Sequence, residues 1–353
     1  MAMTPRLARP RVVVPVLAFA VLAVACSGGG KKQATTTTTA KVTTTTAPPP
    51  AAPLTGLPQA DASKLSRPAL MVKVDNTPKG FAVQEGIDKA DIVFVEQTEQ
   101  GTTRLAAVFQ SQDTTVGPVR SARTSDVDVA GALNHPMLAY SGANGGVLRQ
   151  LRAGPLVDVG IDARGVTPIY TKNQRGNSNN LYRYFLPIAD IYTARGKDGG
   201  TPAPLFAYRA KGEASTGDAV KGVRVGYGGG AATVVTYQWN GKDGWDRTQN
   251  GTAHVMANNH QRISPQNVVI LVTPYKNSGF TDVLGSPSPQ AVLEGSGEAW
   301  FLSDGKLLKG TWSRPGPVGP FTFSGAFGVA VKLTPGQTFI ELAPGAGSAS
   351  VLP

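Results

Sequence analysis

The stretch Ile92–Gln110, IVFVEQTEQGTTRLAAVFQ, determines the fold of the first half of this 353-residue chain. Two apolar, β-rich runs, Ile92–Thr98 and Arg104–Gln110, lie on either side of the four-residue break Glu99–Thr102, which contains a glycine. A break of this kind between two such runs predicts an antiparallel hairpin. The upstream run Ala69–Asp75 has the same character and ends in a turn signal that includes a proline, so we expect a third strand there.

Helical patterns follow these strands. Residues Ser121–Asn134 begin with Ser, Thr and Asp and carry apolar side chains at helical spacing, which predicts a helix. Asn180–Arg195 also has a helical pattern, but Pro187 should kink or split it. Two shorter elements are expected as well: a strand over Met137–Ser141 and a helical turn over Gly145–Leu151. These patterns predict a mixed α/β domain over residues 61–200.

The second half, after the Gly/Pro/Ala-rich stretch Gly196–Pro204, is dominated by strand patterns. No long helical pattern occurs there, and Asp304-Gly305 between two apolar runs is a compact hairpin signal. Strands are expected over Gly222–Gly226, Thr233–Trp239, Trp245–Thr248, Asn267–Thr273, Gln290–Glu294, Glu298–Ser303, Lys306–Trp312 and Gln337–Leu342. The predicted fold class is therefore α+β: an N-terminal mixed α/β domain followed by a mainly β C-terminal domain over residues 215–345, with the boundary near residues 200–220.

Composition limits the chemistry that this chain can perform. Its single cysteine excludes an intramolecular disulfide framework and a cysteine-built zinc site, and three histidines leave little room for a histidine-rich metal centre. We therefore expect neither a metal nor a cofactor. The net charge is +11, but residues 1–60 contribute six of these charges through three arginines and three lysines and hold no acid. The mildly basic remainder does not indicate a nucleic-acid-binding surface.

Residues 1–25 have the pattern of a secretory signal peptide. A basic segment precedes Val12–Val24, an apolar run of 13 residues, whereas a membrane-spanning helix needs about 20. Small residues then lead to Cys26 in an arrangement that resembles a bacterial lipobox, although Ala23 stands where the lipobox usually has leucine, and Leu22 precedes it. The resemblance implies a lipid such as palmitate on the Cys26 thiol, and a location on the outer face of the bacterial cytoplasmic membrane. The alternative is ordinary cleavage, with Cys26 as a bystander.

Residues 26–60 are predicted to form a disordered tether. The segment is rich in Thr and Pro, has no periodicity and contains almost no large apolar side chain, so burial cannot offset the chain entropy of folding. This composition suits an extended stalk, either O-glycosylated or unmodified. Lys31, Lys32 and Lys41 lie near the predicted anchor and would add modest attraction to anionic lipid.

The string Val116–Arg123, VGPVRSAR, is the most specific of several motifs that resemble the YerB-type bacterial lipoprotein family. Further motifs shared with that family lie at Val72–Asn76, Ala90–Val93, Thr103–Leu105, Tyr237, Arg247, Asn250-Gly251, His254, Gly295–Gly297, Asp304–Lys306 and Thr334–Thr338. The resemblance covers about residues 54–343. It implies a two-part domain of unknown function on an exported lipoprotein, and it supplies no reaction. Asn179 stands where the family tends to place histidine, and Met256 where it tends to place an acid; if those groups are catalytic, this member lacks the activity.

A polar cluster around the VGPVRSAR string predicts an anion-binding pocket. Arg120 and Arg123 are three residues apart, so at a helix start they share a face, and the backbone amides there favour an anion. A guanidinium group binds carboxylate or phosphate through two parallel hydrogen bonds. The candidate ligand-binding residues are Arg104, Arg120, Ser121 and Arg123, with Asp75, Asn76 and Glu96 nearby. In the alternative interpretation, the arginines pair with Glu96, Asp126 and Asp128 in structural salt bridges.

Other candidate residues carry weaker signals. Asp126 and Asp128 are too few acids to hold calcium by themselves. His254 and His260 are six residues apart, which fits no zinc motif, so we interpret them as solvated or capping side chains. The aromatic residues Tyr237, Trp239, Trp245, Trp300 and Trp312 lie on predicted strands, and most should be core. Two or three of them on an open sheet face could instead stack on sugar rings.

Two function classes remain. In the first, the chain is a membrane-anchored lipoprotein, not an enzyme, that binds an anionic cell-wall polymer or an envelope protein in the arginine pocket. In the second, it is a hydrolase or transferase that acts on cell-wall polymers through the carboxylates of Asp75 and Glu96. The departures at Asn179 and Met256, and the lack of a recognisable catalytic motif, favour the first class, so we assign no catalytic residue.

Overall fold

The computed structural model describes residues 49–172, 180–228 and 232–353. Cys26, Asn179 and the predicted signal peptide lie outside the described residues, as does the tether up to residue 48. The helices are α1 (Ala62–Ser66), α2 (Pro78–Phe81), α3 (Ser125–Ala130), α4 (Gly145–Ala153) and α5 (Ile188–Arg195). Short 3₁₀ helices occur at Ile87–Lys89, Glu99–Gly101, Thr167–Ile169, Asn180–Tyr182 and Ala326–Gly328.

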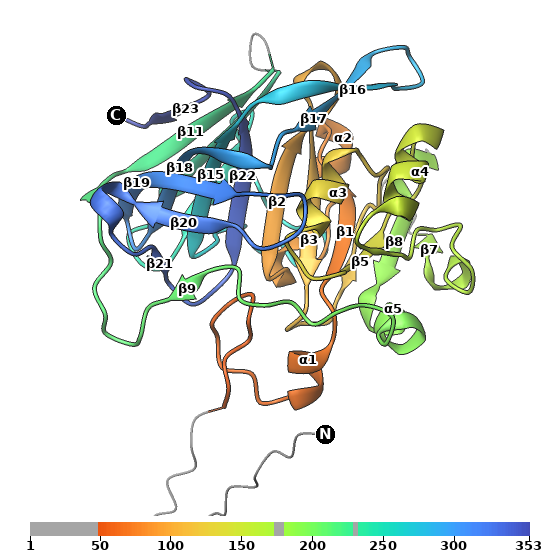
Figure 1. Ribbon diagram of the computed structural model, residues 1–353, viewed down its shortest axis with the longest axis horizontal. Coiled ribbons are helices and arrows are strands. Elements are labelled where there is room, and N and C mark those ends of the chain that lie inside the picture. The colour runs from red at the N-terminus through yellow and green to blue at the C-terminus, as the bar shows by residue number, and fades with distance from the viewer. Residues whose placement is uncertain (1–48, 173–179, 229–231) are drawn as a thin grey trace, which may run out of the picture. The chain divides into compact units, whose positions relative to one another are not determined.

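Within the described residues, an eleven-stranded mixed sheet forms the centre of the fold (Figure 1). Its strands, in spatial order, are β10 (Asp218–Ala219), β19 (Lys306–Arg314), β18 (Gly295–Ser303), β15 (Asn267–Thr273), β22 (Thr338–Pro344), β2 (Ile92–Gln97), β3 (Thr103–Phe109), β1 (Leu70–Asp75), β5 (Met137–Ala139) and β6 (Val157–Asp158), with β20 (Thr322–Gly325) on β19. Strand β22 lies between β15 and β2 and is parallel to both. Strands from both halves of the sequence therefore belong to one sheet.

Smaller sheets surround the central one. A five-stranded sheet comprises β14 (Thr252–Ala253), β13 (Trp245–Gln249), β12 (Thr233–Trp239), β11 (Gly222–Tyr227) and β23 (Ala349–Val351). The remaining strands are β16 (Tyr275–Thr281) with β17 (Pro287–Ala291), β21 (Lys332–Leu333) with β9 (Ala207–Tyr208), and β8 (Tyr184–Pro187) between β4 (Thr115–Val116) and β7 (Thr171–Lys172). This arrangement confirms the predicted class, a mixed α/β N-terminal region with a mostly β C-terminal region.

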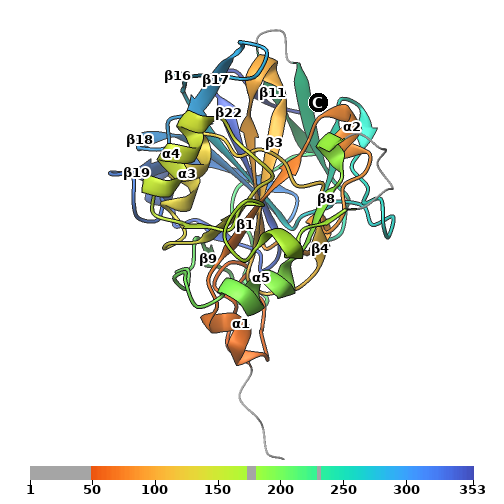
Figure 2. The same ribbon diagram turned by 90° about the vertical axis from the view of Figure 1, so that its right-hand side faces the viewer.

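Alternation along the strands gives the central sheet two apolar faces. On one face, Val93 and Leu105 pack in a cluster with Tyr227 and Tyr237 of the five-stranded sheet. The opposite face is covered by α3 and α4, whose buried side chains join a second cluster with Phe94 and other side chains of β1–β3. Figure 2 shows α3 and α4 together on one side of β1 and β3. The strand residues Asp75, Glu96 and Arg104 of the candidate site lie on this helix-covered face.

Both predicted hairpins are confirmed. Strands β2 and β3 pair antiparallel, with Glu96 opposite Arg104. Strands β18 and β19 pair through the two-residue turn Asp304-Gly305, whose φ angles of 50° and 71° are both positive. Positive φ at both central residues is the geometry that an Asp-Gly turn favours, because its twist matches that of the flanking strands.

Three predicted elements differ from the observed ones. The helix expected over Ser121–Asn134 is limited to α3, because the backbone before it hydrogen bonds elsewhere: the Ala122 N–H donates to the Gly142 carbonyl at 2.9 Å. The segment Asn180–Arg195 does split at Pro187, but the part just before the proline is strand β8. The strand expected over Gln290–Glu294 is observed as β17, which ends at Ala291 and pairs with β16 in a hairpin. The prolines and polar residues of this hairpin give no strand pattern, so the sequence did not predict it.

The folded part also begins earlier than the sequence predicts. Residues 49–60 were expected to belong to the tether, yet the Leu54 side chain is fully buried. The Tyr208 hydroxyl donates to the Leu54 carbonyl at 2.6 Å, and the Gly336 N–H donates to the Thr55 carbonyl at 2.8 Å. This Pro/Ala-rich segment has no helix or strand periodicity that would mark Leu54 as buried, so only the tertiary fold gives it a core to join.

Candidate functional site

The candidate site lies where β1 and β2 end and β3 begins. Asp75, the last residue of β1, is opposite Arg104 of β3, and Glu96 of β2 is opposite the same arginine. Residues opposite each other on neighbouring strands point to the same face of a sheet. The register therefore brings three of the predicted residues together, on the face that α3 and α4 cover.

Asp75 is the counterion of two arginines. Its Oδ2 atom lies 2.8 Å from Arg120 Nε and 3.6 Å from Arg104 Nη2. Its Oδ1 atom accepts hydrogen bonds from the backbone N–H, at 2.8 Å, and the hydroxyl of Thr77. The Asp75 side chain is fully buried, whereas Arg120 keeps a fifth of its side chain exposed. This buried carboxylate holds the two guanidinium groups side by side at the end of strand β1.

The third arginine pairs with a residue that the sequence analysis missed. Arg123 donates to Glu99 Oε2 from Nη2 at 2.9 Å and from Nε at 3.3 Å, and Ser288 donates to Glu99 Oε1 at 2.6 Å. Burial raises the pKa of Glu99, but Arg123 and Ser288 outweigh it and hold the pKa below its ordinary value. Glu99 lies in the turn between β2 and β3, which the sequence predicts as the break of a hairpin. The signal available in the sequence was an acidic residue shortly before Arg104.

The three arginines carry one more charge than their two carboxylate partners. Arg104 has only 4% of its surface exposed, and within the described residues its Nε–H has no hydrogen-bond partner. Burial lowers the pKa of Arg104 to about 10; Asp75 opposes this shift, and Arg123 and Arg120 add to it. The guanidinium group is still charged at neutral pH. The cluster thus retains a positive charge and a buried donor without a partner, and an anion could satisfy both.

Glu96 belongs to a different, fully buried ion pair. Lys73 Nζ contacts the Glu96 carboxylate and lies 2.8 Å from Asp126 Oδ1. Burial raises the pKa of Glu96 to about 7, with Asp126 adding to the shift and Lys73 opposing it. The remaining oxygen of Asp126 accepts from the Arg123 backbone N–H at 2.7 Å at the start of α3, so the contact with Lys73 ties this helix to the sheet. Glu96 therefore lies next to the arginine cluster without contacting an arginine side chain.

The predicted salt-bridge alternative is right about pairing and wrong about the partners. The arginines pair with Asp75 and Glu99, and not with Glu96, Asp126 or Asp128 side chains. Asp128 instead accepts from the Gln290 amide at 2.8 Å and lies 4.0 Å from Arg314 Nη2. Strand register and the position of α3 decide these partners, and neither can be read from spacing along the chain.

The other two predicted site residues have different positions. Ser121 lies at the cluster, and its hydroxyl accepts from Arg120 Nη1 at 3.3 Å. Asn76 turns away from it: the Asn76 amide donates at 2.7 Å to both Thr103 Oγ1 and Gln249 Oε1. Asn76 is fully buried between the central sheet and the five-stranded sheet. Its role is therefore to connect the two sheets.

Asn76 belongs to a buried polar network that sequence reasoning missed. Arg247 Nη2 donates to Gln249 Oε1 at 3.1 Å, and Arg247 Nη1 lies 2.9 Å from His254 Nδ1. Burial and then Arg247 lower the pKa of His254 well below its ordinary value, so the neutral ring accepts at Nδ1 and donates from Nε2 to Gln84. His254 is fully buried, so its interpretation as a solvated or capping histidine is wrong.

The same network also contains the buried carboxylate of Glu341. Glu341 of β22 accepts hydrogen bonds from the hydroxyls of Tyr237, at 2.6 Å, and Tyr227. Tyr237 lies opposite Arg247 in the five-stranded sheet, so the two share its inward face. The side chains of β12 and β13 alternate between the two faces of the sheet. This alternation was the sequence signal that could have placed Tyr237 and Arg247 on the buried face. Because every member is satisfied by another, this network joins the sheets and offers no open site.

Two findings concern metals and membranes. Across residues 49–172, 180–228 and 232–353, no three His, Cys, Asp or Glu side chains converge as metal ligands would. No helix in that part of the chain combines the length and the apolar character needed to cross a bilayer.

Comparison with known proteins identifies relatives of this chain. Residues 54–198 match the family model described as "Protein of unknown function (DUF3048) N-terminal domain", and residues 223–340 match the corresponding C-terminal domain. A Bacillus subtilis (strain 168) protein named "Putative lipoprotein YerB" is 28% identical over 311 residues, which cover 85% of this chain and 88% of that protein. This chain also matches the crystal structure of the YerB protein from Bacillus subtilis, with a TM-score of 0.71 and 24% sequence identity. The match covers 86% of this chain and 99% of that chain. The two chains therefore share a fold.

Proposed function

Because this chain belongs to the DUF3048 family, we propose that it is a lipoprotein, as its Bacillus subtilis relative is named, anchored through lipid on Cys26. The signal pattern of residues 1–25 and the cysteine that follows it support this anchor. The folded part would then stand at the outer face of the bacterial cytoplasmic membrane. Incorporation of radiolabelled palmitate should disappear in Cys26→Ser, and labelling that survives this change would contradict the anchor.

The folded part acts as a binding or scaffold protein of the cell envelope, with the arginine cluster as its anion site. The observation that carries this proposal is the buried Arg104 Nε–H, which has no partner in the described structure, within a cluster of three arginines that are ion-paired with only two carboxylates. Leaving a buried donor unsatisfied costs about 1–3 kcal/mol, so an anion that reaches it gains that amount back. The ligand class is a carboxylate- or phosphate-bearing wall polymer, or an acidic segment of an envelope protein.

The geometry gives less support to an enzyme that uses Asp75 and Glu96. Glycoside hydrolysis needs two carboxyl groups on either side of an open cleft. Asp75 and Glu96 are 0% and 1% exposed, and each is occupied by a cationic side chain. A substrate would have to displace Arg120 from one acid and Lys73 from the other. The binding role needs no such rearrangement.

A titration of the full chain in detergent with poly(glycerol phosphate) tests the anion site. Arg120→Gln should weaken binding about tenfold, because the most exposed guanidinium of the cluster is lost. Arg149→Gln, at an exposed position on α4, is the matched control and should bind as the wild type does. The midpoint of urea unfolding, measured for both variants, separates lost binding from lost folding. Wild-type affinity in a folded Arg120→Gln variant, or no binding by the wild type, would overturn the proposal.

A further inference from the structure

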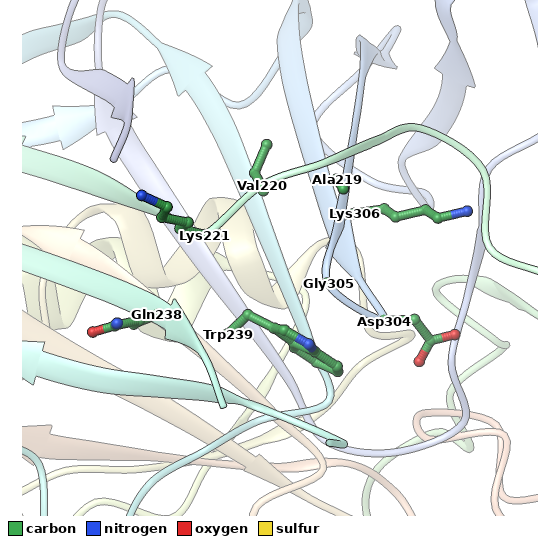
Figure 3. Close-up of a pocket in the computed structure, with 8 residues that line it drawn as sticks. All are labelled: Ala219, Val220, Lys221, Gln238, Trp239, Asp304, Gly305 and Lys306. Carbon is green, nitrogen blue, oxygen red and sulfur yellow. The ribbon is translucent and has the colours of Figure 1, made fainter. Parts of the chain in front are cut away.

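A pocket of about 520 Å³ lies in the C-terminal region, on elements that contribute nothing to the arginine cluster. Three segments line it: the link between β10 and β11, the end of β12, and the turn between β18 and β19. Figure 3 shows its side chains, among them Lys221, Trp239, Asp304 and Lys306. Its size lies within the range of about 300–1,000 Å³ that is common for small-ligand sites.

Backbone hydrogen bonds hold the three segments in place. The Val220 N–H donates to the Gly305 carbonyl at 3.0 Å, and the Trp239 N–H donates to the Lys221 carbonyl at 2.9 Å. Asp304, at the rim, accepts from Arg209 Nη2 at 2.6 Å and from the Thr334 hydroxyl at 3.1 Å. The pocket is therefore formed before any ligand arrives, which reduces the entropy cost of binding.

Trp239 gives the pocket a rigid aromatic wall. Its indole lies against Trp245, with 5.1 Å between the ring centroids, and against Gly305, where an added Cβ would be only 3.0 Å from the indole Nε1. Of the four tryptophans, Trp245, Trp300 and Trp312 are buried, and only Trp239 is partly exposed. A fixed, partly exposed indole offers a flat apolar face together with a polar N–H.

The charge around this indole is positive on both sides. Figure 3 shows the ammonium groups of Lys221 and Lys306 pointing away from each other, on opposite sides of the pocket. Lys306 Nζ donates to the Ser215 carbonyl at 3.0 Å, which leaves two of its three N–H donors available. Asp304 is paired with Arg209, so its carboxylate does not cancel the charge of the lysines.

We propose that this pocket binds an acidic saccharide chain, with one sugar ring on the Trp239 indole and negative groups on the flanking sugars near Lys221 and Lys306. A pyranose ring has an apolar C–H face that fits an aromatic ring, and hydroxyls that the Gln238 amide at the rim can bind. Two ammonium groups that diverge from a central aromatic ring suit a ligand with charges on both sides, and a nucleotide carries its charge on one side only. The proposal does not depend on the arginine cluster.

The test uses the full chain in detergent, labelled with 5-fluorotryptophan, and its ¹⁹F NMR spectrum. Four tryptophans give four signals, and Trp239→Phe identifies the one from Trp239. Tetragalacturonate, which carries carboxylates, or a phosphomannan oligosaccharide, which carries phosphates, should shift that signal saturably. Maltotetraose, which is neutral, and AMP should bind at least tenfold more weakly.

Variants separate this site from the proposed anion site. The double variant Lys221→Ala/Lys306→Ala should bind the responding saccharide at least tenfold more weakly, with the other three fluorine signals unchanged as evidence of folding. Arg120→Gln should leave the shift of the Trp239 signal intact. An unmoved Trp239 signal with both acidic saccharides, equal affinity for AMP or maltotetraose, or wild-type affinity in the folded lysine variant would overturn the proposal.

Discussion

Single residues at the candidate site show how burial decides the role of a charged group. Asp75 of β1 and Glu96 of β2 are on the same face of the central sheet, on either side of β3, and both are buried. Asp75 meets two arginines at the edge of the sheet, whereas Glu96 shares one lysine with Asp126 beneath α3. One lysine therefore pairs with two buried acids, and the fold disfavours the ionised form of Glu96.

Glu96 should make the stability of the protein depend on pH. Its pKa is raised from 4.5 to about 7 in the folded state, so the folded protein binds a proton there more tightly than the unfolded chain does. The stabilisation from that proton is fully present below about pH 4.5 and is lost as the pH rises through about 7. We therefore expect the wild type to lose free energy of unfolding between pH 5 and pH 7.5 relative to Glu96→Gln.

Urea unfolding of both proteins at the two pH values measures this difference. The variant cancels the contributions of other shifted groups, including His254, whose lowered pKa acts in the opposite direction. The same pH dependence in the wild type and in Glu96→Gln would contradict the assignment.

At the scale of elements, helix α2 packs directly on the site carboxylate. Gly80 is in α2, and a Cβ added there would lie 2.3 Å from Asp75 Oδ1. Thr77, just before the helix, donates to the same oxygen, so α2 fixes the orientation of Asp75 through a hydrogen bond and a close contact. The absence of a side chain at residue 80 is what allows this approach.

Gly80→Ala should destabilise the protein by about 1–3 kcal/mol, the usual range for overpacking, and displace Asp75 from Arg120. Gly145→Ala is the matched control, since Gly145 begins α4 and an added Cβ there meets nothing within 4 Å. The control should be neutral or slightly stabilising, because alanine favours a helix over glycine. Chemical denaturation measures both, and a neutral Gly80→Ala would show that α2 does not hold the carboxylate.

Elements with strong local patterns were the ones that could be predicted. The strands β1, β2 and β3 and the Asp304-Gly305 turn follow from apolar runs and turn chemistry, which act between near neighbours in the chain. Hairpin β16–β17 and the shortened helix α3 did not, because their backbone hydrogen bonds go to partners that the local pattern does not reveal. Glu99 was missed for the same reason: its partner Arg123 is 24 residues away in the chain.

At the scale of the whole folded part, strand β22 connects the two halves of the sequence. It lies between β15 and β2, and its Glu341 accepts hydrogen bonds from two tyrosines of the five-stranded sheet. The N-terminal region without β22 would expose the edge of β2 and the apolar face that the five-stranded sheet covers. We therefore expect residues 61–200 and 215–345, interpreted from the sequence as two domains, to depend on each other for a complete core.

Separate expression of residues 49–212 and 213–353 tests this dependence. The cut lies in an exposed loop between the two regions. We expect neither fragment to show a cooperative thermal transition by circular dichroism, and we expect a mixture of the two to regain one. Cooperative unfolding of each fragment alone would show instead that the regions are independent domains.

The sequence by itself determined the family, the class of fold, the positions of most strands and the concentration of arginines around one string, VGPVRSAR. These follow from alternation, turn chemistry and motif spacing, which are local properties of the chain. Only the tertiary structure decided which acid each arginine meets, that His254 is buried, and that β22 completes the central sheet. The physical reason is that ion-pair partners and burial depend on strand register and on which helix covers which face, and distant segments of the chain set both.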